Sequence, residues 1–274
     1  MERIAIYGKG GVGKSVVATS LSAHFGMSGK RVLHVGCDPK HDSAIRLLEP
    51  EAGDVRTILD VLGNNPHAEA TTEILNIGRH GIHACEAGGP PAGLGCGGRG
   101  VARTIEYLDE VEFLEEGNYD VVIFDVLGDV VCGGFAAPLR SGFAEKVAIV
   151  VSEEPMAIFA ANNIARAVVS YHRNGVVLAG LIVNLRGKDV DYSHIEHFAK
   201  EINTKILGVV QRDERIMQAE REQKTIVEFA PDSASAEGLT ALAGVLQTID
   251  VSDTPLPTPM EDGVLYEFMR TWGQ

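Results

Sequence analysis

The sequence predicts an α/β fold in which a doubly wound, mostly parallel sheet is flanked by helices. Short apolar runs alternate with helical patterns along the chain, and such alternation implies parallel strands joined by right-handed crossovers. A glycine-rich segment at residues 8–15 lies between the first run and a helical pattern, the usual context of a phosphate-binding loop. We find no linker among the 274 residues, so we expect one domain over 1–274, with residues 251–274 as a C-terminal arm.

The first expected strand, residues 3–7, leads into the segment GKGGVGKS, which fits the pattern G-x-x-x-x-G-K-[ST] in full. Backbone N–H groups of the loop and the start of the next helix, residues 15–27, favour a bound anion. Lys14 is expected to reach the β- and γ-phosphates, and Ser15 to hold Mg²⁺. The sequence thus predicts a nucleoside triphosphate site, with loop contacts from Gly8, Lys9, Gly10, Gly11, Val12, Gly13, Lys14, Ser15 and Val16.

Lys9 is an additional lysine inside this loop. It is typical of the deviant Walker A (SIMIBI) branch of P-loop NTPases, in which it reaches the nucleotide of the other subunit and neutralises charge on the transferring phosphoryl group. A solvated lysine on a surface turn is the alternative. The first interpretation implies a homodimer with ATP at its interface and a catalytic role for Lys9.

The second expected strand, residues 30–36, ends in CDPKHDS. Groups beyond the carboxyl ends of parallel strands face the ligand, so Asp38 and Asp42 are expected near Mg²⁺ and water, with Lys40 near the nucleotide. Asp38 and Asp42 would alternatively form a turn around Pro39. Cys37 is expected to be a small packed residue.

Two short helical patterns over 54–78 and a strand over 81–86 come next, and they lead into a glycine-rich loop at 87–100. Long irregular loops in compact domains are usually functional. A helix is expected over 101–114, so Cys96 lies just ahead of a helix N-terminus, where a thiolate is favoured.

The apolar run at 119–125 ends in Asp125, as in a Walker B strand whose carboxylate faces Mg²⁺. Asp129 is placed to accept a hydrogen bond from the attacking water. Cys132 follows three residues later, at most ~10 Å along an extended chain, so movement of Asp129 would reach Cys132 directly.

The remaining pattern completes the sheet. Strands are expected at 146–151, 176–184 and 205–210, and helices at 156–171, 194–202 and 233–249. Polar residues at two of these strand ends are candidates for recognition of the nucleotide base: Asn184, Gln211, Arg212 and Asp213.

The overall charge is −14, which argues against nucleic acid or an anionic membrane as a routine partner. The four cysteines are too scattered for a disulfide framework, and no signal peptide or apolar run long enough to span a bilayer is recognised. A cytoplasmic location is expected.

Cys96 and Cys132 each stand beside two glycines. In one chain they do not form a ligand pattern, and ordinary buried cysteines would be the base-rate interpretation. A homodimer, however, would bring four thiolates to its two-fold axis, which is the ligand count of one [4Fe–4S] cluster.

At this point the sequence resembles the iron protein of nitrogenase and its nitrogenase-like relatives. The resemblance covers almost the whole chain and is strongest in GKGGVGKS, GCDPKHDS, EAGGPPAGLGCGGRGV and FDVLGDVVCGGFA. It implies an ATP-dependent oxidoreductase component that donates one electron from a [4Fe–4S] cluster shared through Cys96 and Cys132.

The resemblance also implies further roles. Asp38 and Asp129 would serve hydrolysis, and Asp42 and Asp125 the Mg²⁺ ion and the switching segments. Arg99 would lie on the docking face, or would simply be a surface arginine at the helix start.

The implied partners are a second copy of the chain, a nitrogenase-like catalytic metalloenzyme, and a ferredoxin or flavodoxin as upstream donor. Methylthio-alkane reductase is the first expectation for the acceptor, followed by true nitrogenase and then nickel-tetrapyrrole or protochlorophyllide reduction. The competing classes are a partition or spatial-regulation ATPase, which would carry no cluster, and an iron–sulfur scaffold ATPase, which would use a C-x-x-C pair.

Overall fold

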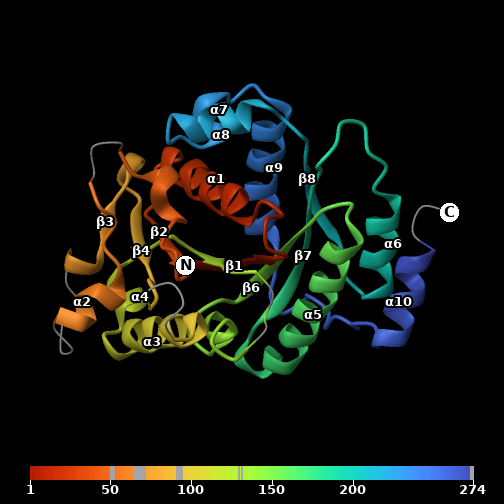
Figure 1. The fold of residues 1–274 in the computed structure, drawn as a ribbon, viewed down its shortest axis with the longest axis horizontal. Coiled ribbons are helices and arrows are strands. Elements are labelled where there is room, and N and C mark those ends of the chain that lie inside the picture. The colour runs from red at the N-terminus through yellow and green to blue at the C-terminus, as the bar shows by residue number, and fades with distance from the viewer. Residues whose placement is uncertain (50–52, 65–71, 91–94, 129, 131, 272–274) are drawn as a thin grey trace.

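The molecule is built on one central sheet (Figure 1). The computed structural model describes residues 1–49, 53–64, 72–90, 95–128, 130 and 132–271. Its eight strands have the order β3-β4-β2-β5-β1-β6-β7-β8, and the pairs are parallel except for the antiparallel β3–β4 pair. The strands are β1 (Glu2–Gly8), β2 (Val32–Cys37), β3 (Asn76–Ile77), β4 (His83–Glu86), β5 (Val121–Val126), β6 (Lys146–Val151), β7 (Val177–Asn184) and β8 (Ile206–Val210). The predicted doubly wound, mostly parallel sheet is confirmed.

Helices cover both faces of this sheet, as Figure 1 shows. The α-helices are α1 (Lys14–Met27), α2 (Ile58–Asn64), α3 (Gly97–Glu110), α4 (Phe113–Glu116), α5 (Pro155–Tyr171), α6 (Ser193–Glu201), α7 (Arg215–Arg221), α8 (Ile226–Phe229), α9 (Ala234–Thr248) and α10 (Asp262–Arg270). Short 3-10 turns are η1 (Ala44–Leu47), η2 (Thr72–Ile74), η3 (Arg79–Gly81), η4 (Ala137–Leu139) and η5 (His172–Asn174).

Alternation along the strands produces two apolar layers. In β1, Ala5 and Tyr7 join the core that α3, α5 and α6 cover, whereas Ile4 and Ile6 join the core beneath α1, α8 and α9. Successive strand side chains point to opposite faces, so a strand buried on both faces must be apolar throughout. Residues 4–7 are accordingly fully buried, and β1 lies at the centre of the sheet.

The structure corrects one predicted helix. The pattern over 101–114 predicts a single helix, but α3 begins at Gly97 and ends at Glu110, and Glu112, at φ 47°, separates it from α4. The sequence places the start of this helix too late because three of the residues 97–100 are glycines, which have low helix propensity. Gly98 and Gly100 are nevertheless buried in the first turn, so close packing decides the start. Cys96 therefore occupies the N-cap position of α3, without a capping hydrogen bond from its side chain.

Residues after α9 run back over α5 and α6. The buried amide of Asn162 pairs with the backbone of Met260 in both directions, at 2.9 and 2.8 Å. Leu265 of α10 is fully buried, and Tyr266 stacks on Phe159 with ring centroids 6.2 Å apart. These contacts hold the last helix against the body of the chain. No helix in the described residues has the length and apolar character needed to cross a bilayer.

Candidate nucleotide and cysteine site

Four connections leave the same edge of the sheet. β1, β2, β4 and β5 are mutually parallel neighbours, so their carboxyl ends lie together, where ligands of open α/β sheets bind. The glycine-rich loop follows β1, the Asp38 segment follows β2, and the loop to Cys96 follows β4. Asp125 is the next-to-last residue of β5. The topology therefore gathers the predicted site residues at one edge.

The phosphate loop is fixed by side chains from the end of β7 and from just beyond it. Gly13 caps α1 at φ 96°, a left-handed conformation that favours glycine, and a Cβ there would collide with the amide of Asn184. That amide donates to the carbonyl of Val12 at 2.7 Å. Arg186 donates to the carbonyl of Gly11 at 2.7 Å, a contact that the sequence analysis missed. With these carbonyls held from outside, the loop N–H groups are left for an anion.

Lys14 is buried, and its ammonium lies 3.2 Å from the carbonyl of Lys9. This contact folds the lysine back over the loop, where the motif places the phosphates. Lys9 is more exposed, and its side chain lies 3.9 Å from the Glu154 carboxylate, at the limit of an ion pair. An exposed pair at this distance contributes little stability, so Lys9 is available for another partner. Its reach across a dimer remains a prediction.

Asp125 is the buried acid of the site, at 4% exposure. It accepts hydrogen bonds from Ser15 and Ser43, and the Ser43 bond is 2.5 Å long. Burial raises the pKa of Asp125, while Ser15, Ser43 and Lys14 oppose the rise. Ser15 and Asp125 thus meet as a hydroxyl–carboxylate pair, a donor set suited to Mg²⁺. Ser43 was quoted in the sequence motif but given no role.

The segment after β2 turns around Pro39. Asp38 accepts from the backbone N–H of Lys40 at 2.9 Å, and burial raises its pKa, while Lys40 opposes the rise. Asp42 is exposed, as is Lys40. His41 adopts φ 48° and donates its N–H to the carbonyl of Asp38 at 3.1 Å. Asp38 therefore begins a turn around Pro39, and the nearby Asp125 carboxylate contributes to the rise in the pKa of Asp38.

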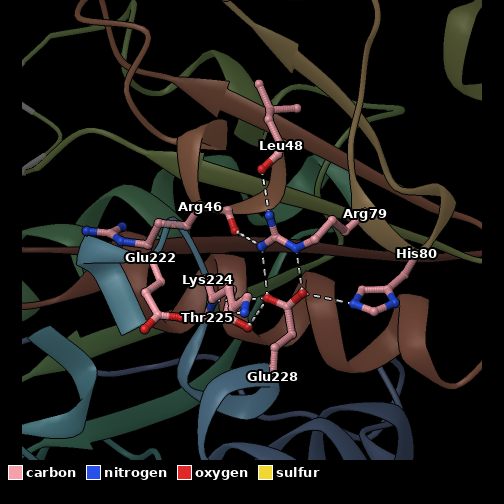
Figure 2. Close-up of polar contacts among 8 residues, drawn as sticks. All are labelled: Arg46, Leu48, Arg79, His80, Glu222, Lys224, Thr225 and Glu228. Carbon is pink, nitrogen blue, oxygen red and sulfur yellow. Dashed lines mark hydrogen bonds and ion pairs between the residues drawn. The ribbon is translucent and has the colours of Figure 1, made fainter. Parts of the chain in front are cut away.

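Figure 2 shows how the far end of this segment is anchored. Arg79 donates to the carbonyls of Leu48 and Arg46, each at 2.5 Å, and to the Glu228 carboxylate at 2.8 and 3.1 Å. Thr225 and His80 also bind Glu228. Burial pushes the pKa of Glu228 upward, but the hydrogen bonds from Arg79, Thr225 and His80 outweigh it and lower the pKa to about 2. The cluster joins η1 to α8 through an ionised carboxylate.

The candidate base contacts lie beyond β8. Gln211 and Arg212 are exposed, and the carbonyl of Gln211 accepts from Ser235 at 2.7 Å. Asp213 is held by Arg215 at 2.9 Å, and that hydrogen bond lowers the pKa of Asp213. Asn184, by contrast, uses its amide N–H on the phosphate loop. Base recognition by these residues stays a prediction.

Cys96 and Cys132 are both exposed, unlike Cys37 and Cys85, which are buried. The structure brings the exposed pair together, because the Cys132 sulfur lies over the first turn of α3: a Cβ on Gly98 would stand 2.6 Å from it. A side chain on Gly134 would in turn collide with the backbone of Gly98. The ordinary buried-cysteine interpretation is therefore wrong for this pair, whereas the packed role predicted for Cys37 is confirmed.

Two thiols at one surface supply half of the four ligands that a [4Fe–4S] cluster needs. The described residues of one chain contain no group of three or more histidine, cysteine or acidic side chains arranged to hold a metal ion. The pair therefore fits a cluster only if a second copy supplies the other two thiolates. The first turn of α3, in which Arg99 is exposed, adds N–H groups that favour anionic sulfur. Asp129 lies outside the described residues.

Glu86, the last residue of β4, was missed by the sequence analysis. It is fully buried, its Oε1 accepts from the N–H of Ala44 at 2.6 Å, and a Cβ on Gly36 would collide with its carboxyl group. Burial, aided by the carboxylates of Asp125, Asp42 and Asp38 and opposed by the hydrogen bond from Ala44, raises the pKa of Glu86 to about 8. A neutral carboxylic acid thus supports the start of η1. An acidic residue closing an apolar strand is the signal that could have found it.

Comparison with known proteins gives a family match and several structures of similar fold. A family model described as 4Fe-4S iron sulfur cluster binding proteins, NifH/frxC family, matches residues 2–274. Among solved structures, the cell division protein MinD of Aquifex aeolicus is similar at 20% identity and TM-score 0.69, over 93% of this chain and 99% of that chain.

Two further structures share the fold. MinD of Pyrococcus horikoshii OT3, solved with Mg-ADP, has 20% identity and TM-score 0.70 over 90% of this chain and 97% of that chain. A ParA family ATPase from Chlorobium tepidum TLS has 15% identity and TM-score 0.68 over 88% and 97%. At these identities the likeness shows the fold alone.

Proposed function

This chain belongs to the NifH/frxC family of 4Fe-4S iron–sulfur cluster binding proteins, and on that premise we propose that it is an ATP-dependent electron donor. Its working form is a homodimer that couples hydrolysis of MgATP to transfer of one electron to a partner metalloenzyme. The observation that carries the proposal is the exposed cysteine pair, with the Cys132 sulfur over the first turn of the helix that Cys96 caps. A P-loop ATPase without a cluster gives no reason for this arrangement.

The nucleotide half of the proposal uses residues at the sheet edge. Lys14 and the loop N–H groups bind the phosphates, and Ser15 and Asp125 hold Mg²⁺, with Asp42 acting through water. Asp38 and Asp129 serve the attacking water. Lys9 enters from the partner subunit and stabilises the charge on the transferring phosphoryl group.

The cysteine half uses the two-fold axis. Cys96 and Cys132 from both copies supply four thiolates, and the cluster they hold supplies one-electron reduction when bound. The backbone N–H groups around Gly97 and Gly98 would tune a bound cluster by hydrogen bonding to the sulfurs. Arg99, exposed beside the cysteines, belongs to the face that meets the acceptor.

The acceptor is a nitrogenase-like catalytic component, with methylthio-alkane reductase as the first candidate and true nitrogenase as the second. Nickel-tetrapyrrole and protochlorophyllide reductases follow. A ferredoxin or flavodoxin reduces the dimer, and the whole system operates in the cytoplasm without nucleic acid or membrane partners.

Anaerobic purification with iron counting tests the proposal. We expect a brown dimer with about four irons per two chains and, after reduction, the low-temperature EPR signal of a one-electron-reduced cluster. Cys96→Ala and Cys132→Ala should each lose the iron, while Cys85→Ala, at a buried cysteine, should keep it. A colourless ATPase that binds DNA or lipid vesicles would instead favour the spatial-regulation class. An anaerobic pull-down with the reduced dimer then identifies the acceptor.

A further inference from the structure

A buried row of polar side chains runs from α1 to Asp125. His34, in the middle of β2, is fully buried and pairs with Ile123 of β5 and Ala84 of β4. Its Nδ1 lies 2.9 Å from the Ser22 hydroxyl, and its Nε2 lies 2.8 Å from the Ser43 hydroxyl. Ser43 in turn donates to Asp125. A histidine in a strand otherwise apolar on both faces calls for a reason, because the burial of a polar group is costly.

The protonation of this row follows from hydrogen-bond accounting. Burial lowers the pKa of His34 to about 3, so the imidazole is neutral and carries one N–H. When Asp125 is ionised, as binding of Mg²⁺ requires, its carboxylate only accepts, and the single hydrogen of Ser43 points to it. The Ser43 oxygen must then accept from Nε2–H of His34, and Nδ1 accepts from Ser22.

The other end of the row is adaptable. The Ser22 hydroxyl also lies 3.0 Å from the carbonyl of Ala18 in the preceding turn of α1, so its hydrogen has two acceptors within reach. The Ser43 end has no such freedom, because Asp125 and His34 occupy its donor and acceptor directions. His34 Nε2–H therefore occupies the acceptor direction of the Ser43 hydroxyl and leaves the Asp125 carboxylate as the acceptor for its hydrogen.

We propose that His34 is a positioning residue for Mg²⁺-dependent ATP hydrolysis: its Nε2–H directs the Ser43 hydroxyl onto Asp125 and so orients that carboxylate toward Ser15. The row runs through the rigid centre of the sheet, since β2 is hydrogen-bonded on both sides. It thereby ties the Asp38 segment, which Ser43 ends, to the acid at the end of β5. The inference rests on the nucleotide half of the proposed function and needs neither the cluster nor an acceptor.

Two substitutions of similar size separate the hydrogen bond from packing. His34→Gln keeps a donor near the position of Nε2, whereas His34→Leu fills the space without one. We expect His34→Leu to lower kcat for ATP hydrolysis about five- to tenfold with KM for ATP changed less than about twofold, as for loss of one hydrogen bond. His34→Gln should recover most of the rate. The control is His83→Gln on the neighbouring strand, whose ring instead contacts Tyr119 at 2.8 Å, and it should leave kcat unchanged.

Two readouts do not depend on turnover. Mn²⁺ bound in place of Mg²⁺ in the ADP complex should dissociate about five- to tenfold more readily from His34→Leu, by EPR titration. In the wild-type chain with Mg²⁺ and ADP, ¹⁵N NMR of labelled histidine should show His34 neutral with the proton on Nε2, its signal identified by its loss in His34→Gln. This measurement applies even if His34→Leu does not fold.

Some results would overturn the inference. An Nδ1–H tautomer or a charged ring would contradict the assignment of a neutral His34 that donates from Nε2 to Ser43. Normal kcat and Mn²⁺ affinity in a folded His34→Leu chain would show that the row is only structural. Either outcome leaves the proposed function intact. A wild-type chain that binds iron but hydrolyses no ATP would reject the proposed function as well.

Discussion

Pro39 packs directly against Gly97, so closely that a Cβ on Gly97 would stand 2.5 Å from the proline Cγ. The other side of the contact is equally tight, because a Cβ on Gly89 would collide with the same proline. Pro39 follows Asp38 at the nucleotide edge, and Gly97 follows Cys96. We therefore expect a movement of the Asp38 turn to reach the cysteine loop through this contact, in addition to the short chain connection from Asp125 to Cys132.

This contact predicts that Gly97→Ala uncouples the two sites. The added methyl group displaces Pro39, and overpacking of this kind costs about 1–3 kcal/mol, more than the gain of at most about 1 kcal/mol in helix propensity. We expect a lower free energy of unfolding in urea and slower ATP hydrolysis, with nucleotide binding retained.

The double variant Pro39→Ala/Gly97→Ala supplies the check, because it removes the obstacle. A double-mutant cycle should give a coupling free energy above about 0.5 kcal/mol. Gly133→Ala is the matched control, since a Cβ there meets nothing within 4 Å. Additive effects of the two substitutions would mean that the contact transmits nothing.

Lys9→Ala should abolish hydrolysis while sparing binding. The substitution keeps the residue 9 carbonyl that Lys14 contacts at 3.2 Å, so the phosphate site remains formed. Removal of a charge that acts in trans is expected to lower kcat about 10³-fold, with little change in the dissociation constant for ATP by calorimetry. Glu154→Gln, which removes the weak partner of Lys9, should leave both quantities unchanged.

Mixed dimers test whether Lys9 acts across the interface. A Lys9→Ala subunit binds nucleotide but lacks the lysine that acts on the partner's nucleotide, whereas a Lys14→Ala subunit keeps Lys9 but binds nucleotide poorly. Mixing the two inactive proteins should restore hydrolysis at one of the two sites. Absence of any restored turnover in verified mixed dimers would assign Lys9 to its own subunit.

Gly98→Ala is predicted to remove iron without touching a cysteine. Its Cβ would stand 2.6 Å from the Cys132 sulfur, so the thiol must move away from the start of α3. The purified dimer should contain less than half of the wild-type iron, measured by colorimetric assay, and should still bind ATP. Full iron content would show that the sulfur position is not the one that holds the cluster.

The stability contributed by Glu228 should depend on pH with a definite sign. Its pKa is lowered to about 2 in the folded chain, below an unfolded value of about 4.3. The contribution is therefore fully present above the unfolded pKa and is lost as the pH falls from about 4.3 toward 2. The difference in unfolding free energy between wild type and Glu228→Gln should shrink over that window.

A surface ion pair is the control for this effect. Glu110 pairs with Arg103 at 2.9 Å, with 59% of its side chain exposed. Glu110→Gln should change the free energy of unfolding by less than about 1 kcal/mol across the same range. A Glu228→Gln difference that stays constant down to pH 2.5 would show that Arg79 does not hold an ionised carboxylate.

Local patterns in the sequence determined the longer strands, most of the longer helices and the phosphate loop, because each depends on residues within a few positions of one another. The prediction was wrong for β3, Asn76–Ile77, which lies in the stretch 54–78 expected to be helical. The apolar run of β5 closed by Asp125 and the glycines around Lys14 are such patterns. The sequence also predicted which residues belong to the site, because they follow the carboxyl ends of the predicted parallel strands. The short helices α7 and α8 were missed, since α8 is defined by packing against α1 and α9, and α7 by packing against α8, more than by their own periodicity.

The tertiary structure decided which of these groups meet. Asn162 holds the C-terminal arm, Asn184 and Arg186 hold the phosphate loop, and Cys132 lies over Gly98, although none of these pairs is close in sequence. The order of the strands in the sheet determines such contacts, and hydrophobic periodicity does not predict that order. The sequence by itself determined the chemistry of a nucleotide loop and a cysteine pair, and only the folded sheet determined that Pro39 and Gly97 join them.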